Sequence, residues 1–255
     1  MKRSSFYFVL LAILLGTFPF AASGTEPPLE PQKECAYPAP GQVVYSGHAG
    51  LDLGACLDGA HASEIRELKI TSHGGDARQT LQVVTRYRGK IDLVIVARWC
   101  NSSCANYVIP AAKKLIVLPD SYVIVHGSID PDAVAKDIET QRKALAEKYP
   151  QIPANEWDKT FEKTINDLKA QRALQDDFEK RRLQCSAWLH PDEFVANEIA
   201  AGRLRGTADQ IKGLVVTKKM AMRCLKRTRI LSNWSAASQN DLPEELVKEG
   251  ALLAR

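Results

Sequence analysis

Two patterns of apolar and polar positions alternate along the first half of the chain. Apolar runs of strand length recur, with the longest almost continuous, at 43–47, 68–72, 91–97, 114–119 and 121–127. Between two of them, Ala77, Leu81, Val84 and Tyr87 recur at three- and four-residue spacing and stop before Gly89, which is typical of an amphipathic helix. We expect further helices at 103–112 and within "ASEIREL" (62–68).

Alternating strands and helices predict an α/β fold with a largely parallel sheet. In such sheets, ligands gather where strands end and helices begin. The segments "SHGGD" (72–76) and "CNSSCA" (100–105) fall at two of these junctions, and His126 closes another strand. Three candidate site segments therefore converge from separate places in the sequence.

The segment 130–183 is densely charged and has a helical period, and Pro150 and Pro153 divide it into two helices. Its charges are typical of solvated helix faces, and the alternative is an arm for self-association or for covering a cleft. A helix and a short strand-like return follow. We place the main domain at 43–217 and interpret 218–255 as a basic, weakly structured tail.

The amino terminus has the features of a secretory signal peptide. Lys2 and Arg3 precede an apolar run, small residues follow it, and cleavage near Gly24 is expected. A proline-rich lead-in then covers 25–42. The sequence therefore predicts an exported bacterial protein, periplasmic or secreted, whose mature chain has no integral membrane span.

All six cysteines lie in the exported part, where an oxidising compartment lets them pair. Six cysteines allow 15 connectivities. Our candidate pairs are Cys35 with Cys56, Cys185 with Cys224, and Cys100 with Cys104. The pair Cys100 with Cys104 is left open. If both residues lie on a helix, their Cα atoms are within disulfide distance, but if Cys100 lies at the extended end of a strand, they are farther apart.

Charge and metal-ligand spacing narrow the function classes. Cleavage of the signal peptide removes Lys2 and Arg3 and lowers the formal net charge of +4 by two. The mature chain is therefore nearly neutral, and its net charge does not indicate nucleic-acid binding. There is no C-x-x-C, and the five histidines show no H-x-x-x-H spacing, so we expect no metal and no cofactor.

Between the cysteines of "CNSSCA", Ser102, Ser103 and Cys104 are the alternative nucleophiles. A serine on a tight strand-to-helix turn presents its oxygen beside the unpaired N–H groups of the helix amino terminus, which suits acyl transfer. Cys104 is the weakest nucleophile candidate, because one residue into the helix its side chain turns away. We predict Ser103 as nucleophile and His126 as general base, with oxyanion donors in the backbone N–H groups of Cys104 and Gly75.

The segments "ITSHGGD" and "CNSSCANYVIPAAKKLIVLPDSYVIVHGS" resemble the glycine turn and the catalytic block of the Clp protease proteolytic subunit, in the ClpP/crotonase-like superfamily. With the signal peptide and the C-x-S-x-C-A form, the chain resembles exported Clp-protease-like proteins. This resemblance implies a core of repeated ββα units with the charged helical arm inserted, and the same four site positions. It also implies a peptide or protein as substrate or partner, and relatives assemble into rings or trimers, so a homo-oligomer is among the expectations.

Two departures from this family pattern keep two functions open. The acid expected just before Trp188 is absent, with Asp176, Asp177 and Asp192 as displaced candidates, and His73 replaces the usual proline of the glycine turn. One hypothesis is an exported serine hydrolase, peptidase-like in substrate. The other is a catalytically impaired relative that uses the cleft to bind a peptide or a protein.

Overall fold

The computed structural model describes residues 33–128, 131–202, 213–232, 234, 242, 244 and 251–253, so the predicted signal peptide and most of the lead-in lie outside the described residues. It has an α/β fold with one mixed sheet. The strands are β1 (Glu34–Ala36), β2 (Gln42–Ser46), β3 (Ile65–Ser72), β4 (Ile91–Asn101), β5 (Lys114–Val117), β6 (Tyr122–Val125), β7 (Gly213–Val215), β8 (Arg229–Ile230) and β9 (Ala251–Leu253).

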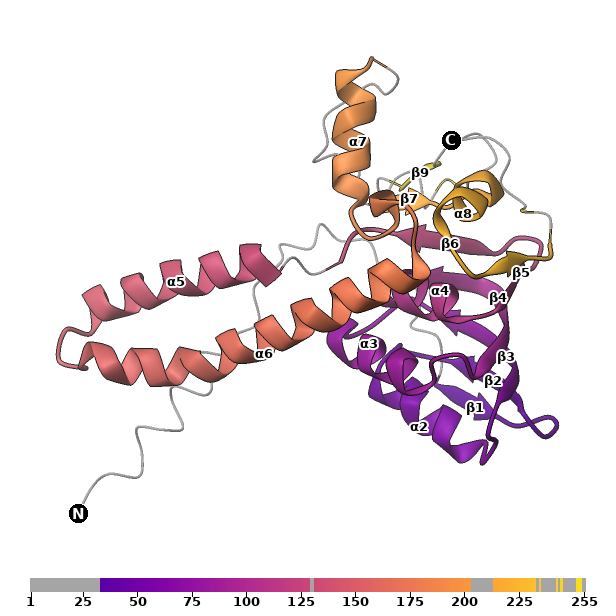
Figure 1. The fold of residues 1–255 in the computed structure, drawn as a ribbon, viewed down its shortest axis with the longest axis horizontal. Coiled ribbons are helices and arrows are strands. Elements are labelled where there is room, and N and C mark those ends of the chain that lie inside the picture. The colour runs from indigo at the N-terminus through magenta and orange to yellow at the C-terminus, as the bar shows by residue number, and fades with distance from the viewer. Residues whose placement is uncertain are drawn as a thin grey trace. The chain divides into compact units, whose positions relative to one another are not determined.

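The helices are α2 (Leu51–Gly59), α3 (Ala77–Arg86), the π-helical turn η1 (Cys104–Val108), α4 (Ile109–Ala111), α5 (Pro131–Lys148), α6 (Ala154–Arg182), the 3₁₀ turn η2 (Ser186–Trp188), α7 (Pro191–Ala200) and α8 (Lys218–Cys224). Helices α2, α3 and α4 lie on one side of the strands (Figure 1). Among the described helices, none combines the length and the apolar character needed to cross a bilayer.

The sheet changes partner strand halfway along β4. Strands β2, β3 and β4 are parallel neighbours, and the first half of β4 pairs with β5 while its second half pairs with β6. Between the halves, the register of β4 against β3 shifts, and Arg98 adopts φ 87°. Strands β5 and β6 therefore share one edge of β4, and the end of β4 lies beside β6.

Buried aliphatic residues explain why the strands form where the apolar runs predicted them. Along β3, Ile65, Leu68 and Ile70 are each 0% exposed. The expected helix over 62–68 was therefore wrong: this stretch enters β3, whose pairing with two neighbouring strands overrides the helical spacing. The helix of this region lies earlier, at α2, where Gly54 allows close packing against Val83 of α3.

The charged segment forms two helices, α5 and α6, which lie side by side (Figure 1). Pro153 stands at the amino terminus of α6, in agreement with the predicted division. The end of α6 reaches the core, because Phe178 and Leu183 are buried there. The rest of α6 is largely exposed, as expected for solvated charged faces.

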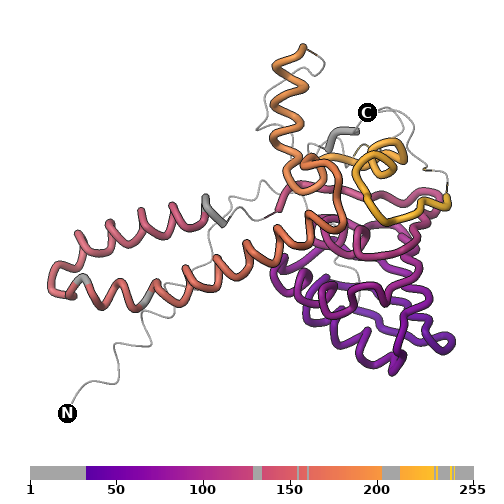
Figure 2. The backbone as a smooth tube through the Cα atoms, viewed as in Figure 1, coloured from indigo at the N-terminus to yellow at the C-terminus, as the bar shows by residue number. Residues whose placement is uncertain are grey.

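The first part of the predicted tail is folded, which corrects that interpretation. Helix α8, in yellow in Figure 2, follows β7. Strand β8 adds to the sheet parallel to β5. Cys224 of α8 is disulfide-bonded to Cys185, and Met220 and Ala221 are buried. In 218–229 the buried apolar residues are Met220, Ala221, Cys224 and Leu225, whereas Met222 is exposed.

Three disulfides join all six cysteines in the candidate pairs, including the one left open by the sequence: Cys35–Cys56, Cys100–Cys104 and Cys185–Cys224. They connect β1 to α2, the end of β4 to η1, and the start of η2 to α8. Such bonds persist in oxidising compartments, so they fit an exported protein.

Candidate active site

The ends of β3 and β4 bring the two predicted junctions side by side. Ser72 pairs with Cys100 in the sheet, so the glycine turn that follows β3 lies against the turn that follows β4. The contact between the turns is close: a Cβ atom placed on Gly74 would lie 2.4 Å from the Cβ of Ser102 and 2.9 Å from its Oγ. Gly74 has φ 99°, which favours glycine. The side chain of Ser102 therefore lies against the glycine turn.

The end of β6 supplies the third segment. The N–H of Ser102 donates a hydrogen bond of 2.9 Å to the carbonyl of Ile124, two residues before His126. Ser102 and His126 therefore follow adjacent parallel strands at the same edge of the sheet. The structure thus brings together the three segments that the sequence predicted would converge.

Ser102 occupies the turn between β4 and the helix in a left-handed conformation. Its φ is 55°, and the residue is partly exposed. Its carbonyl accepts the first helical hydrogen bond, from the N–H of Asn106, at 2.8 Å. A serine with positive φ is uncommon, and such strained residues concentrate at functional sites. The N–H groups that follow Ser102 belong to the first turn of the helix, where backbone donors have no partner within the helix.

Ser103, the predicted nucleophile, lies in a different environment. The residue is 1% exposed, and its Oγ is 3.3 Å from Oγ1 of Thr80 on α3. Thr80 also donates to the carbonyl of Asp76 at 2.7 Å, so the pair forms part of the packing between α3 and the start of the helix. In the described part of the chain, the structure records no hydrogen bond between Ser103 and His126. The accessible hydroxyl at this junction is that of Ser102.

Both predicted oxyanion donors lie at the junction. Gly75 is exposed and pairs with Ala49 as a single bridge, and a Cβ on Gly75 would lie 2.1 Å from the Ala49 carbonyl oxygen. Only glycine fits this approach. Cys104 is in the first turn of the helix, one residue beyond Ser103. If Ser102 attacks, the N–H of the next residue, Ser103, is the donor in the equivalent position.

His126 is exposed, and among the described residues it makes no recorded hydrogen bond or ion pair. The displaced acids do not reach it. Asp176 pairs with Arg172, and Asp177 pairs with Arg88 and Arg181. Asp192 lies in the first turn of α7. Within the residues that the structure describes, no carboxylate orients the imidazole.

The segment after His126 is fixed by neighbouring elements. The carbonyl of Gly127 accepts a hydrogen bond of 2.7 Å from the Asn106 side chain, and the N–H of Ser128 donates to the carbonyl of Leu189 at 2.9 Å. The indole N–H of Trp188 donates to the carbonyl of Ala105 at 3.1 Å. The helix after Ser102 and the end of β6 are thus both anchored at the same place, by residues near η2.

The Cys100–Cys104 disulfide spans the turn that holds Ser102. The two Cα atoms are 5.3 Å apart, and both residues are 0% exposed. The bond ties the end of β4 to the first turn of the helix across three residues, of which Ser102 is the middle one. It therefore restricts the turn to a narrow set of conformations.

A row of aromatic rings lies next to the glycine turn, and His73 is the one member of it that the sequence analysis singled out. The ring centroids of His73 and Trp99 are 6.0 Å apart, and those of Trp99 and Tyr122 are 5.4 Å apart, both pairs stacked. The side-chain nitrogen of Asn101 is 3.5 Å from Nδ1 of His73. His73 is thus placed beside the site by the end of β4. The row forms because β4 pairs with β6, and the periodicity of apolar residues alone does not predict this pairing.

Across the described residues, no group of three or more His, Cys, Asp and Glu side chains is arranged to hold a metal ion. The chemistry available at the junction is that of a hydroxyl, an imidazole and backbone N–H groups. Comparison with known proteins adds no family to this picture: neither a scan against models of protein families nor a search of curated proteins found a match.

Proposed function

We propose that the protein is an exported serine hydrolase that acts at an acyl carbon, with Ser102 as nucleophile and His126 as general base. The observation that carries the proposal is the left-handed turn at Ser102, which lies against Gly74 with its side chain partly exposed. A strained turn between a strand and a helix is how hydrolases present a nucleophile clear of the backbone.

In the first step, Ser102 Oγ bonds to the carbonyl carbon of the substrate and its proton passes to the imidazole of His126. The backbone N–H groups of Ser103 and Gly75 stabilise the resulting oxyanion, each contributing on the order of 3 kcal/mol. The imidazole then returns the proton to the leaving group as the carbon–leaving-group bond breaks. Water then attacks the acyl carbon as its proton passes to the imidazole, and the imidazole returns a proton to Ser102 Oγ as the bond between this oxygen and the acyl carbon breaks.

Because the imidazole of His126 is exposed and no described carboxylate orients it, we expect slow turnover. Loss of the orienting carboxylate from a triad lowers turnover by about 10⁴-fold. The site therefore supports acylation more readily than fast turnover, and covalent labelling is a more sensitive assay than product formation.

The resemblance to the ClpP/crotonase-like superfamily supports the reaction class and implies peptides or other acyl compounds as substrates, whereas its residue-by-residue match gives Ser103 as the nucleophile. The C-x-S-x-C form places a serine at position 102. The parallel strands β2, β3 and β4 are joined through the helices α2 and α3, which is an alternation of strand and helix.

The test uses the mature chain and a fluorophosphonate probe, which bonds to activated serines. Ser102→Ala is expected to abolish labelling, and His126→Ala to slow it by about 100-fold or more, as expected for a general base. Ser103→Ala is the matched control, one residue away, and is expected to label. Loss of labelling in Ser103→Ala with full labelling in Ser102→Ala would return the nucleophile to Ser103.

A second candidate function rests on the absence, among the described residues, of a carboxylate beside His126. Under it, the protein binds a peptide or a partner protein at this junction without cleaving it. The two functions differ in what a folded sample does with the probe. The binding function would be favoured by two results together: the folded protein is not labelled, and the Ser102→Ala variant binds peptide as tightly as the unchanged protein.

A further inference from the structure

The helical arm formed by α5 and α6 has no role in the reaction described above, yet one turn of α6 reaches the segment that carries His126. Gln175 of α6 is 3% exposed, and its side-chain N–H donates a hydrogen bond of 3.1 Å to Oγ of Ser128. Ser128 stands two residues after His126. A buried amide of the arm is therefore bonded to the chain that holds the proposed general base.

The Gln175 side chain is held from its other side by Tyr107. The buried Tyr107 hydroxyl donates a hydrogen bond of 3.3 Å to Oε1 of Gln175. Burial, with the negative charge of Glu179 as the second cause, raises the pKa of this hydroxyl, so it keeps its proton at neutral pH. Because Tyr107 engages the amide oxygen, the amide nitrogen faces Ser128 as a donor.

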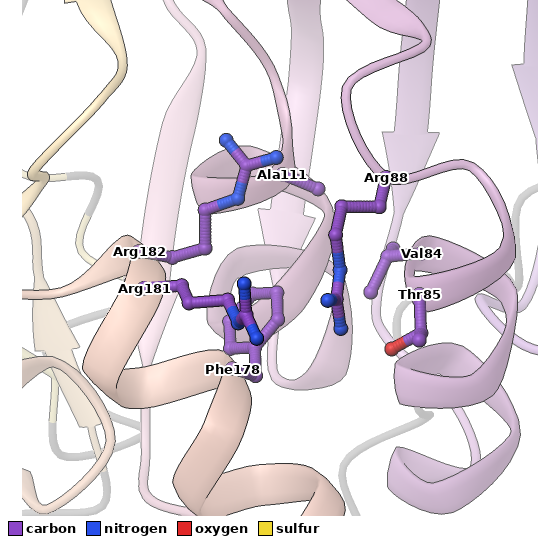
Figure 3. Close-up of a pocket in the computed structure, with 7 residues that line it drawn as sticks. All are labelled: Val84, Thr85, Arg88, Ala111, Phe178, Arg181 and Arg182. Carbon is purple, nitrogen blue, oxygen red and sulfur yellow. The ribbon is translucent and has the colours of Figure 1, made fainter.

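Packing holds this turn of α6 against the core. Phe178, one turn after Gln175, is buried, and its ring meets the Tyr107 ring edge-on, with 5.6 Å between the centroids. Phe178 also lines one small cavity with Val84 of α3 and Ala111 of α4 (Figure 3). Close-packed side chains of this kind occupy well-defined rotamers. The Gln175 amide is thus presented from the packed base of the arm.

A second buried amide holds the residue next to His126. Asn106, directly before Tyr107, is 1% exposed, and its side-chain N–H donates a hydrogen bond of 2.7 Å to the carbonyl of Gly127. Its backbone N–H donates to the carbonyl of Ser102 at 2.8 Å. Asn106 is therefore bonded both to the proposed nucleophile and to the residue that follows the proposed base.

The stability of the fold alone does not explain an amide at position 106. The Oδ1 atom of Asn106 is buried and has no hydrogen-bond partner in the described part of the chain. A buried acceptor without a partner destabilises the folded state, and an apolar residue of similar shape would avoid this cost. The bond from Asn106 to Gly127 is thus kept together with an unfavourable atom, as expected where the bond fixes a functional segment.

From these contacts we infer that Asn106 and Gln175 are positioning residues for His126, and that they act through its backbone. This inference rests on the function proposed above. In a triad, a carboxylate bonds to the second ring nitrogen of the base and sets the orientation of the ring. Here the two amides hold residues 127 and 128 instead, so they determine where the imidazole is attached and leave its rotation free. The base of the arm is then a supporting part of the active site.

A purely structural role for the two amides makes different predictions. Loss of either amide would then lower the unfolding temperature and leave the labelling of folded protein unchanged, or would slow labelling by the same factor with and without His126. If the amides act through His126, their loss has no further effect once the imidazole is removed. A double-mutant cycle with His126→Ala separates the two roles.

The experiment measures the fluorophosphonate labelling rate of the mature chain, per folded molecule, for Asn106→Leu and Gln175→Met. Both replacements keep nearly the shape of the side chain and remove its donor. We expect each to slow labelling by about 10- to 100-fold, as a displacement approaching 1 Å does, and by less than about 2-fold in a His126→Ala background. Gln171→Met is the matched control and should label at the original rate. Gln171 is also buried, one turn earlier on α6, and its amide nitrogen has no partner among the described residues.

Nuclear magnetic resonance of the imidazole tests the positioning without any labelling. The ring signals of His126, assigned by their loss in His126→Ala, should shift in Asn106→Leu and in Gln175→Met and stay in place in Gln171→Met. Either variant alone is sufficient if the other does not fold. Shifted signals in a folded protein that the probe does not label would refute the hydrolase function and support the positioning. Unchanged ring signals in the folded variants, or equal slowing of labelling with and without His126, would overturn the inference.

Discussion

The position of the Ser102 turn depends most directly on Gly74, and replacing this glycine tests that dependence. In Gly74→Ala the new Cβ would lie 2.4 Å from the Cβ of Ser102 and 2.9 Å from the carbonyl oxygen of Asn101. Contacts shorter than 3.0 Å do not persist, so the Ser102 turn must retreat by about 0.6 Å. The backbone at Gly74, with φ 99°, also becomes strained.

The expected magnitudes follow from these two effects. A left-handed conformation costs a non-glycine residue about 1–2 kcal/mol, and overpacking adds about 1–3 kcal/mol. In a protein of this size each kcal/mol lowers the unfolding temperature by about 2–4 °C. A displacement approaching 1 Å at a reacting atom lowers rates by up to about 10²-fold, so we expect fluorophosphonate labelling to slow by about 10- to 100-fold.

Gly89→Ala is the matched control, because Gly89 has φ 73° and a Cβ there would meet no atom within 4 Å. It should carry the conformational cost of about 1–2 kcal/mol without slowing labelling. The assay compares the labelling rate and the unfolding temperature of both variants with those of the unchanged protein. If Gly74→Ala labels at the original rate, or if Gly89→Ala slows labelling to the same degree, the contact between the two turns does not position the nucleophile.

Three further predictions test the surroundings of the site. A double Cys100→Ser and Cys104→Ser variant should lose about 2 kcal/mol of stability and react more slowly with the probe. Removal of the β1–α2 disulfide, which closes a longer loop, should cost more stability and leave the labelling rate unchanged. Trp188→Phe removes the indole donor to a buried carbonyl, and urea unfolding should show a loss of about 1–3 kcal/mol. Burial raises the pKa of Tyr45 to about 12, so this tyrosine ionises first in the unfolded chain. The contribution of Tyr45 to stability should therefore be constant below about pH 10 and be lost between about pH 10 and pH 12, and Tyr45→Phe should lack that share of the loss in unfolding followed by circular dichroism.

Most of the strands could be predicted from the sequence, because in the central strands the apolar positions of the sequence are the positions that are buried in the structure. Residues such as Leu68 and Val94 are fully buried in the strands that the apolar runs predicted. The expected helix at 62–68 failed for a non-local reason: β3 pairs on both sides with strands distant in sequence. The folding of 218–230 was missed for a similar reason, since the disulfide of Cys224 and the pairing of β8 with β5 both depend on distant residues.

The sequence predicted that the candidate residues meet at this junction, and it favoured Ser103, whereas the structure leads us to propose Ser102. The choice between Ser102 and Ser103 depends on the backbone dihedral angles of one turn, and periodicity carries no information on those. The Cys100–Cys104 pair contained a signal, because a bridge across three residues places the middle one, Ser102, at the apex. With that pairing left open, the start of the helix favoured Ser103, whose side chain instead packs against Thr80.

The small cavity that Arg88, Arg181 and Arg182 line could not be predicted from the sequence, because Arg88 and Arg182 are 94 positions apart and line the same cavity only when α6 packs against α3. In the sequence, the arginines at the end of α6 belong to a charged segment typical of solvated faces. Burial of Arg182 is a property of the packing, and only the structure separates it from the exposed charges before it.

The most direct test of the account is to find which residue carries the probe. The mature protein is reacted with a fluorophosphonate and digested, and the peptide that spans 99–113 is fragmented to locate the adduct. The account predicts a single adduct on Ser102, lost on unfolding before the reaction. An adduct on Ser103, or no adduct on a sample shown to be folded, would contradict it.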